Sequence, residues 1–368
     1  KFFNVRRHFH FLHVSKQKNT MEKDTLYDKI AGSLIGGAAG DALGFTVEFN
    51  SLGIIKATYG NDGISAYEPV NGVAQISDDT QMTLFTADAL TQLGNESYIT
   101  NIALRYIKDD YLAWYRTQGC QARLAPHSPL EDIPQLHSRR APGITCLSAL
   151  GALSMGRVVE NDSKGCGGAM RVAPVALYAL RRSDMSALDV ANLAGEAALL
   201  THRHPLGFIS AAYLATTIYL CANDTSQNQD EILYVNAPKA ISVIEELYGK
   251  DYAHAVKQMT AIVEKAVRMA REKDSLDIDN IRSLGEGWVG EEAVGIALYC
   301  ALRHSDDFSA ALRAAVNHDG DSDSTGAICG NILGAIWGYD RIPYIWKENL
   351  ELHDTLLATA RRLADINI

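Results

Sequence analysis

The chain has 368 residues, of which 47% are hydrophobic, so it can bury a large core as one large or two smaller domains. A formal net charge of −10 argues against a basic nucleic-acid-binding face, and no run of 18 apolar residues predicts a membrane-spanning helix. Six cysteines without a CxxC pair indicate reduced thiols, so we expect a cytoplasmic protein with no nucleic-acid or membrane partner.

The first twenty residues differ from the rest of the chain, because they contain five Lys or Arg residues, four Phe residues and no acid. They lack the unbroken apolar stretch of a secretory signal peptide, although a transit peptide shares their basic composition. We interpret residues 1–20 as an arm that docks in an acidic groove of a partner protein. The alternative is that the arm packs on the chain's own acidic body.

The remaining chain is predicted to be helical. Apolar residues recur at helical spacing over residues 26–44, 81–93, 186–200, 211–222, 240–247, 255–270, 291–303 and 308–318. Residues 53–59 are the only weak strand candidate, while 117–143 and 222–238 have the composition of loops. Because there is neither a fixed-period repeat nor a long linker, the sequence predicts one all-α domain over residues 21–368.

Two segments carry glycine at every fourth position. These glycines are Gly32, Gly36, Gly40 and Gly44 in the first segment, and Gly326, Gly330, Gly334 and Gly338 in the second. Each glycine inside a helix costs about 1 kcal/mol relative to alanine, so the repetition needs a reason. Small residues on one face let two helices approach closely, and we therefore predict that these two helices pack against each other.

A group of oxygen donors begins the helix predicted at 81–93. Ser77, Asp78 and Asp79 are consecutive, and capping of that helix is their simplest role. One cap needs only one side chain, however. Neighbouring residues of a regular helix point about 100° apart, so three side chains could converge only at a junction between loop and helix. Metal binding is the second interpretation.

A second group of acids contains Asp319, Asp321 and Asp323, followed by Ser324. The spacing imitates the start of an EF-hand calcium loop. That loop needs Gly at its sixth position and Glu at its twelfth, whereas Ser324 and Gly330 stand there, so the EF-hand interpretation is excluded. Asp321 and Asp323 could still point at one place from an extended turn.

Both groups together consist of oxygen ligands. They are Ser77, Asp78, Asp79, Asp321, Asp323 and Ser324. Crowded carboxylates repel one another and imply cations, and hard oxygen ligands suit Mg²⁺, Mn²⁺ or Ca²⁺ better than zinc. This many ligands favours two metals over one. The alternative is two unrelated helix caps.

A glycine-rich turn precedes another apparent helix. It contains Ser163, Lys164, Gly165, Gly167 and Gly168. Backbone N–H groups in such a turn can hold an anion at a helix start, although the pattern is not that of a P-loop and a purely structural turn explains it equally well. His202 and His204 follow, and a histidine at a helix end is more often a cap or a packed surface residue.

In combination, these segments resemble the ADP-ribosylglycohydrolase family, which includes the dinitrogenase-reductase-activating glycohydrolases and the ADP-ribosylarginine hydrolases. The matching segments span residues 30–338 in family order and read GGAAGDALGFTVEF, SDDTQMT, RAPGITCLSAL, SKGCGGAMRVAP, LTHRHP, GEGWVGEEAVGIALY and GDSDSTGAICGNILGA. The resemblance implies a compact all-α fold of orthogonal helices with a dinuclear cleft that holds two Mg²⁺ or Mn²⁺ ions.

The resemblance also implies roles for individual residues. The two ligand motifs would be Ser77, Asp78 and Asp79 together with Asp321, Asp323 and Ser324. Glu48 would approach the metals and the substrate ribose, and either Glu48 or Asp79 would accept the proton of the attacking water. The diphosphate would lie on the turn formed by Ser163, Lys164, Gly165, Gly167 and Gly168. His202 would face the substrate, and Trp288 would contact adenine or ribose.

The resemblance favours a hydrolase that removes mono-ADP-ribose from protein side chains, most readily from arginine. Serine-linked or free ADP-ribosyl compounds are alternative substrates. A non-catalytic ADP-ribose-binding or structural relative is a further alternative, against which the intact ligand set argues. The basic arm adds the hypothesis of an immunity protein, in which residues 1–20 block a cognate ADP-ribosyltransferase.

Overall fold

In a computed structural model, the structure describes residues 23–366 except 95, 124, 181 and 273, so the arm predicted at 1–20 lies outside the described residues. The described chain forms fifteen α-helices and four short 3₁₀ helices, with isolated β-bridges but no named strand among these residues. The α-helices are α1 (Lys23–Phe45), α2 (Leu52–Tyr59), α3 (Asp78–Leu93), α4 (Thr100–Thr117), α5 (Ile144–Ser154), α6 (Ala173–Ala179), α7 (Ala187–Leu199), α8 (Pro205–Asn223), α9 (Gln229–Tyr248), α10 (Ala253–Arg271), α11 (Asp277–Leu284), α12 (Gly290–Arg303), α13 (Phe308–Val316), α14 (Ser322–Trp337) and α15 (His353–Ala364). The 3₁₀ helices are η1 (Pro129–Asp132), η2 (Pro134–His137), η3 (Cys166–Gly168) and η4 (Tyr344–Trp346). The all-α prediction is confirmed.

The strand suggested at residues 53–59 is wrong, because this segment belongs to α2. Ser51 caps the helix by accepting a hydrogen bond from the Ile54 N–H. The buried residues are Leu52 and Ile55, which are three apart and therefore share one face of a helix. A strand would have buried residues two apart.

The loop suggested at 222–238 is also mostly wrong, because α9 begins at Gln229. Asp230 and Glu231 lie in its first turn, where the helix dipole favours acids. Ile232 and Leu233 are buried behind them. The polar composition therefore belongs to the exposed face of a helix rather than to a loop.

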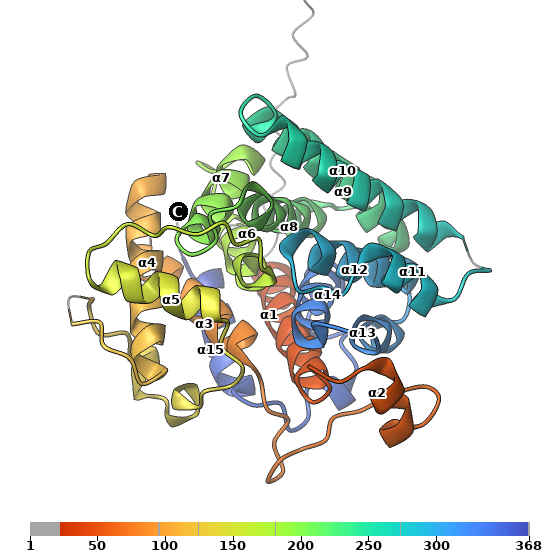
Figure 1. Ribbon diagram of the computed structural model, residues 1–368. Helices are drawn as coiled ribbons and strands as arrows, with labels where there is room; N and C mark the ends of the chain where they lie inside the picture. Colours follow the sequence, from red (N-terminus) through yellow and green to blue (C-terminus); the bar gives the residue numbers. More distant parts are fainter. Residues whose placement is uncertain (1–22, 95, 124, 181, 273, 367–368) are drawn as a thin grey trace, which may run out of the picture.

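The two glycine-striped helices, α1 and α14, pack against each other at the centre of the molecule (Figure 1). A Cβ atom on Gly40 would lie 1.9 Å from the carbonyl oxygen of Gly326, and one on Gly330 would lie 1.9 Å from that of Gly36. Neither helix could come this close to the other with any larger residue, because real Cβ atoms do not approach backbone atoms to this distance. The predicted pairing is confirmed.

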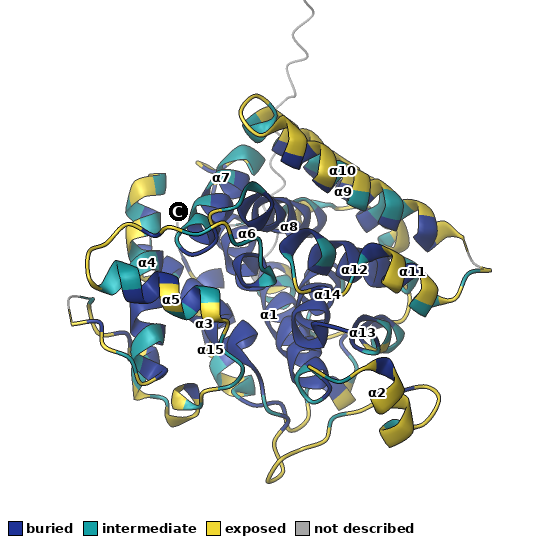
Figure 2. Ribbon diagram, in the orientation of Figure 1, coloured by how far each residue is buried: buried dark blue, intermediate teal, exposed yellow. Residues whose placement is uncertain are grey.

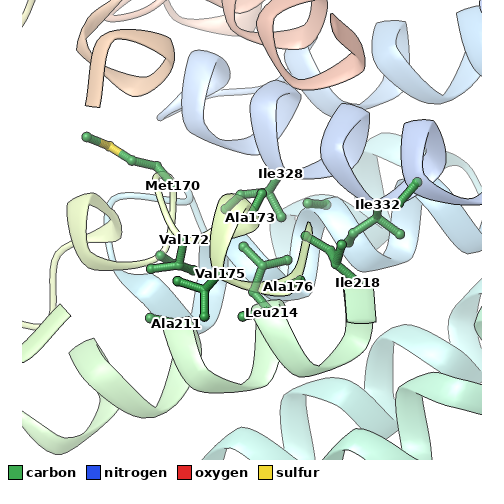
Figure 3. Close-up of a cluster of buried hydrophobic side chains, with 14 of the residues drawn as sticks. Met170, Val172, Ala173, Val175, Ala176, Ala211, Leu214, Ile218, Ile328 and Ile332 are labelled. Carbon is green, nitrogen blue, oxygen red and sulfur yellow. The ribbon is translucent and has the colours of Figure 1, made fainter. Parts of the chain in front are cut away.

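The remaining helices surround this pair, so that buried residues concentrate in the middle and exposed residues on the outer helices (Figure 2). One part of the core lies between α6, α8 and α14 (Figure 3), where Val175, Leu214 and Ile328 are among the buried side chains. Helix α8 is long and apolar enough to cross a membrane by length and composition. However, 83% of its most apolar window is buried inside the fold, as in the core helix of a globular domain.

The central pair also positions the ends of three segments. The carboxyl end of α1 meets the start of α14, since a Cβ atom on Gly44 would lie 2.2 Å from the carbonyl oxygen of Ser322. The loop that leaves α1 carries Glu48. Helix α3 starts at Asp78, and the backbone N–H of Ser77 donates to Asp41 of α1 at 2.9 Å. The acids of all three segments therefore lie at one end of the central pair.

Candidate active site

A cavity of about 470 Å³ opens at this end of the central pair. It collects most of the residues singled out in the sequence: Glu48, Asp78, Asp79, Gly165, Gly167, His202, Trp288, Asp321, Asp323 and Ser324 all line it. Ser77, Ser163, Lys164 and Gly168 do not line it. Segments up to 276 positions apart thus contribute to one site, as the distance in sequence from Glu48 to Ser324 shows.

Carboxylates converge in the cavity, and Arg139, which also lines it, forms no ion pair with them in the described part of the chain. Glu48, Asp321 and Asp323 each offer an oxygen within 4.8 Å of the others. One oxygen of Glu48 and one of Asp79 are buried with no hydrogen-bond partner. Over the described residues, no Lys or Arg forms an ion pair with these acids or with Asp78. The described chain therefore provides no ion pair that would balance these acids in their ionised forms.

The electrostatic consequence is a strong preference for the neutral carboxyl forms in the absence of a cation. Burial, followed by repulsion from Asp323, raises the pKa of Glu48 to about 10. The same two causes raise the pKa values of Asp78, Asp79 and Asp321 well above their usual range. A bound divalent cation would reverse this preference.

The donor set fits a hard divalent cation, because buried unpaired carboxylate oxygens are its preferred ligands. Glu48, Asp321 and Asp323 are the residues best placed to hold one ion, and the unpaired oxygen of Asp79 is a further available donor. Ser77 has a different local role, because its hydroxyl accepts a hydrogen bond from the Asp79 N–H at 3.2 Å and so caps α3. Its role as a ligand stays a prediction.

Asp41 supports the first ligand motif, and sequence reasoning did not assign it a role in the site. Its carboxylate accepts hydrogen bonds from the backbone N–H groups of Ser77 and Thr80 and from the Thr80 hydroxyl. Asp41 thereby holds the start of α3 against α1. The sequence did contain a signal, because Asp41 lies within a glycine-rich helix that packs against another helix. An acid buried there needs hydrogen-bond donors for its carboxylate.

The second ligand motif is held by contacts of a different kind. Asp321 caps α14, and one of its oxygens accepts a hydrogen bond from the Ser324 N–H. Its other oxygen accepts a hydrogen bond from the thiol of Cys166 at 2.7 Å. Asp319 points elsewhere, accepting from the Leu52 N–H and pairing with Arg282 at 3.2 Å. Asp321 is thus fixed by the glycine-rich turn, and Asp319 stays outside the cavity.

The glycine-rich turn lies against a histidine. The Gly165 N–H donates to the Ser163 hydroxyl at 3.3 Å. A Cβ atom on Gly165 or on Gly167 would lie 3.3 Å from Nε2 of His202, which is tighter than ordinary contact. The glycines therefore bring backbone and imidazole to the same wall of the cavity.

Two members of the turn face away from the cavity. A Cβ atom on Gly168 would lie 3.0 Å from the carbonyl oxygen of Gly207, so this glycine serves packing. The ammonium of Lys164 forms an ion pair with Glu291, and its side chain lines a neighbouring cavity of about 440 Å³. The sequence could not indicate this direction, because Glu291 lies 127 positions away.

His202 is held as a neutral hydrogen-bond donor. Arg171 donates to the Thr201 hydroxyl at 2.6 Å, and that hydroxyl lies 2.8 Å from Nδ1 of His202. Geometry favours donation of the hydroxyl proton to Nδ1, because the other acceptor of this hydroxyl among the described residues, the carbonyl oxygen of Ala198, is 3.4 Å away. The ring proton is then on Nε2, which faces the turn. Burial, together with the charge of Arg171, lowers the pKa of His202 to about 3.

An aromatic pair stands at the rim of the cavity. Phe49 and Trp288 stack with ring centroids 5.6 Å apart and an interplanar angle of 17°. Phe49 is 71% exposed although it lines the cavity, and Trp288 is 37% exposed. Phe49 was not singled out in the sequence; its position directly after Glu48 was the only signal.

Comparisons with known proteins identify the family of the chain. The profile of the ADP-ribosylglycohydrolase family matches residues 22–367. The chain belongs to this family. A solved structure titled ADP-ribosylglycohydrolase-related protein complex shares the fold, with a TM-score of 0.59 and 24% identity over 94% of this chain and 100% of that chain.

Three characterised relatives illustrate the range of the family. The chain is 24% identical to the ADP-ribosyl-[dinitrogen reductase] glycohydrolase of Rhodospirillum rubrum over 90% of this chain and 93% of the relative. It is 26% identical to the ADP-ribosylhydrolase ARH3 of Danio rerio over 93% and 91%. It is 24% identical to the ADP-ribosylarginine hydrolase Tri1 of Serratia proteamaculans over 91% and 79%.

Family membership confirms the coarser expectations from the sequence. The protein is an ADP-ribosylglycohydrolase-family hydrolase, in a metal-dependent family that removes ADP-ribose from ADP-ribosylated proteins. The acidic cluster of Glu48, Asp321 and Asp323 could hold the metal.

Proposed function

We propose that this enzyme hydrolyses the N-glycosidic bond between ADP-ribose and an arginine side chain of a modified protein, with two Mg²⁺ or Mn²⁺ ions as cofactors. The observation that carries the proposal is the union of two features in one cavity. Buried carboxylate oxygens without partners lie beside a glycine-rich turn whose Gly165 and Gly167 line the cavity without side chains. Relatives named for ADP-ribosylarginine and for ADP-ribosyl-dinitrogen reductase support the linkage.

The binding half of the cavity suits the diphosphate. Gly165 and Gly167 let the backbone approach a phosphate closely, and the Nε2–H of His202 donates toward the same wall. Because the pKa of His202 is lowered to about 3, the imidazole stays neutral at physiological pH. It therefore binds and orients the substrate rather than exchanging a proton with it.

The acidic half suits the chemistry at the anomeric carbon. Cleavage of a glycosidic bond develops oxocarbenium character, which nearby carboxylates stabilise. Glu48 and Asp79 are the candidate acceptors of the attacking water's proton, because each keeps a buried oxygen free of hydrogen bonds. Bound metal ions would supply a lowered pKa for water and ligation for the ribose hydroxyls. Glu48, Asp78, Asp79, Asp321 and Asp323 would hold them.

The direct test is release of ADP-ribose from an arginine-modified protein, with Mg²⁺, Mn²⁺ and EDTA compared. We expect release with either ion and none with EDTA. A serine-modified peptide run in parallel addresses the alternative linkage. Release from the serine peptide alone would replace arginine by serine in the proposal, and metal-independent binding without release would favour a binding protein.

The immunity hypothesis concerns residues 1–20, and its support is their basic, acid-free composition. A chain that starts at Met21 tests it. If the arm blocks a cognate transferase, the shortened protein will keep its hydrolase activity and lose inhibition of that transferase. Equal inhibition by both proteins would remove the hypothesis.

A further inference from the structure

Phe49 combines two unfavourable features in one residue. Its ring is 71% exposed at the mouth of the cavity, although an apolar ring gains free energy when it is buried. Its backbone φ is 65°, in the left-handed region that costs a residue with a Cβ atom about 1–2 kcal/mol. Such strain at the edge of an active site indicates that the direction of the side chain matters.

Other residues of the same chain hold the Phe49 ring in this direction. Its ring stacks on Trp288, and the carbonyl of Trp288 accepts a hydrogen bond from the Cys166 N–H at 3.2 Å. The Gly290 N–H donates to the carbonyl of Lys164 at 2.7 Å, so the segment around Trp288 is tied on both sides to the glycine-rich turn. One face of the Phe49 ring is covered by this support, and most of the rest of the ring is open.

Phe49 lines the same cavity as Glu48, Asp321 and Asp323, so its open ring stands at the mouth of the acidic site. An aromatic face attracts a planar cation by cation–π interaction. Resting on the proposed function, we infer that Phe49, supported by Trp288, is a stacking platform for the guanidinium of the ADP-ribosylated arginine. Phe49 thereby determines specificity for arginine-linked over serine-linked substrates.

The position of the ring favours the leaving group over the adenine as its occupant. The bond to be cleaved must lie at the carboxylates, and the leaving side chain runs from there to the solvent at the mouth. Adenine is separated from that bond by the distal ribose, the diphosphate and the adenosine ribose. A serine linkage offers no cation or planar group to the ring, so the platform discriminates between the two linkages.

The test compares Phe49→Leu and Phe49→Tyr with the wild type on an arginine-modified protein and on a serine-modified peptide, with Mg²⁺ present. Leucine keeps apolar bulk but removes the aromatic face, so we expect KM for the arginine substrate to rise about tenfold with kcat within twofold. Tyrosine keeps the face, and its KM should stay within twofold of the wild type. The KM for the serine peptide should not respond to either change.

Inhibition by agmatine, a free guanidinium compound, gives a second measurement that involves no bond cleavage. Its inhibition constant should rise several-fold in Phe49→Leu. Tyr344→Leu is the matched control, because Tyr344 is 70% exposed and does not line the cavity, and it should change neither value.

The outcomes separate the two proposals. If the wild type does not release ADP-ribose from arginine, both the proposed function and the platform fail. Arginine release with an unchanged KM and agmatine constant in Phe49→Leu overturns only the platform. An equal rise of KM for both linkages also overturns it, because the ring would then contact a group common to both substrates.

Discussion

Helix α3 carries a cluster of carboxylates at each end, and the two clusters differ in what balances their charge. At its start, Asp78 and Asp79 join the active-site acids, and no Lys or Arg of the described chain pairs with them. Near its other end, Asp88 is fully buried and pairs with Arg362 at 2.6 Å. Asp88 also accepts hydrogen bonds from Gln92 and from the Ser128 hydroxyl.

The second cluster is therefore complete within the protein, whereas the first is not. Asp110 shares Gln92 with Asp88, and burial with repulsion from Asp88 raises its pKa to about 8, so it is protonated at neutral pH. One cation and one proton thus balance this cluster. The active-site cluster has no such cation from the described residues, and Glu48 and Asp79 each keep a buried oxygen without a hydrogen bond, which is the state expected of a site that receives an external cation.

The two clusters should differ most when one active-site acid is removed. We expect Asp321→Ala to lower kcat/KM for ADP-ribose release by about 10³-fold or more, because the cation loses a ligand where charge develops. Without metal, relief from burying this acid offsets the loss of the α14 cap, so the stability of the variant should lie within about 1 kcal/mol of the wild type. Thermal unfolding with and without Mg²⁺ measures this, and the metal-induced rise in Tm should disappear.

Asp319→Ala is the control for this change, because Asp319 lies two positions away but bonds Leu52 and Arg282 outside the cavity. Asp319→Ala should keep the rise in Tm that Mg²⁺ induces in the wild type. Full hydrolysis by Asp321→Ala would contradict the metal site.

The active site should also respond when the two central helices, α1 and α14, are forced apart. In Gly330→Ala, the new Cβ atom would lie 1.9 Å from the carbonyl oxygen of Gly36, so α1 and α14 must move apart. We expect a loss of about 3 kcal/mol of stability, and a loss of activity as Glu48 separates from Asp321 and Asp323. Urea unfolding gives the stability change.

Gly53→Ala provides the comparison, because its Cβ atom would meet nothing closer than Ser51 Oγ at 3.8 Å. It should leave stability unchanged or raise it slightly. Equal stability of the two variants would contradict the close helix contact.

A substitution in the cluster of Asp88, Asp110 and Arg362 should change the stability of the protein and leave its catalytic activity unchanged. Arg362→Ala leaves the buried charge of Asp88 without its cation. We expect a loss of about 2 kcal/mol, reduced from the value for a fully buried pair because Arg362 is 45% exposed and water can enter. The KM and kcat should not change at a temperature where the variant is folded. Arg268→Ala breaks an exposed pair with Glu272 and should cost almost nothing; a similar loss in both variants would refute the assignment.

The stability of the protein should also depend on pH. Because the pKa of Asp110 is raised in the folded state, its stabilising contribution is present in acid and is lost as the pH rises from about 4 toward 8. The slope cannot exceed about 1.4 kcal/mol per pH unit for one proton. In Asp110→Asn the contribution of Asp110 should be lost and the slope should become shallower, while the active-site acids keep theirs; unfolding curves between pH 5 and 8 would show the difference. An unchanged slope would mean that Asp110 is ionised in the folded protein.

The sequence by itself determined the class of the fold, the central helix pair and the two pairs of acids that line the cavity. Glycine at every fourth position is a strong signal, because its cost within each helix is offset only by close approach of another helix. Asp78 with Asp79, and Asp321 with Asp323, could be recognised because each pair lies within a few residues of the chain.

The tertiary structure decided the features that depend on partners distant in the chain. Asp41 holds the start of α3 across 36 positions, and Glu291 draws the Lys164 side chain away from the cavity across 127. Phe49 is a rim residue only because Trp288 supports it. A side chain's direction is set by what packs against it, and for these residues the folded chain alone brings that partner within reach.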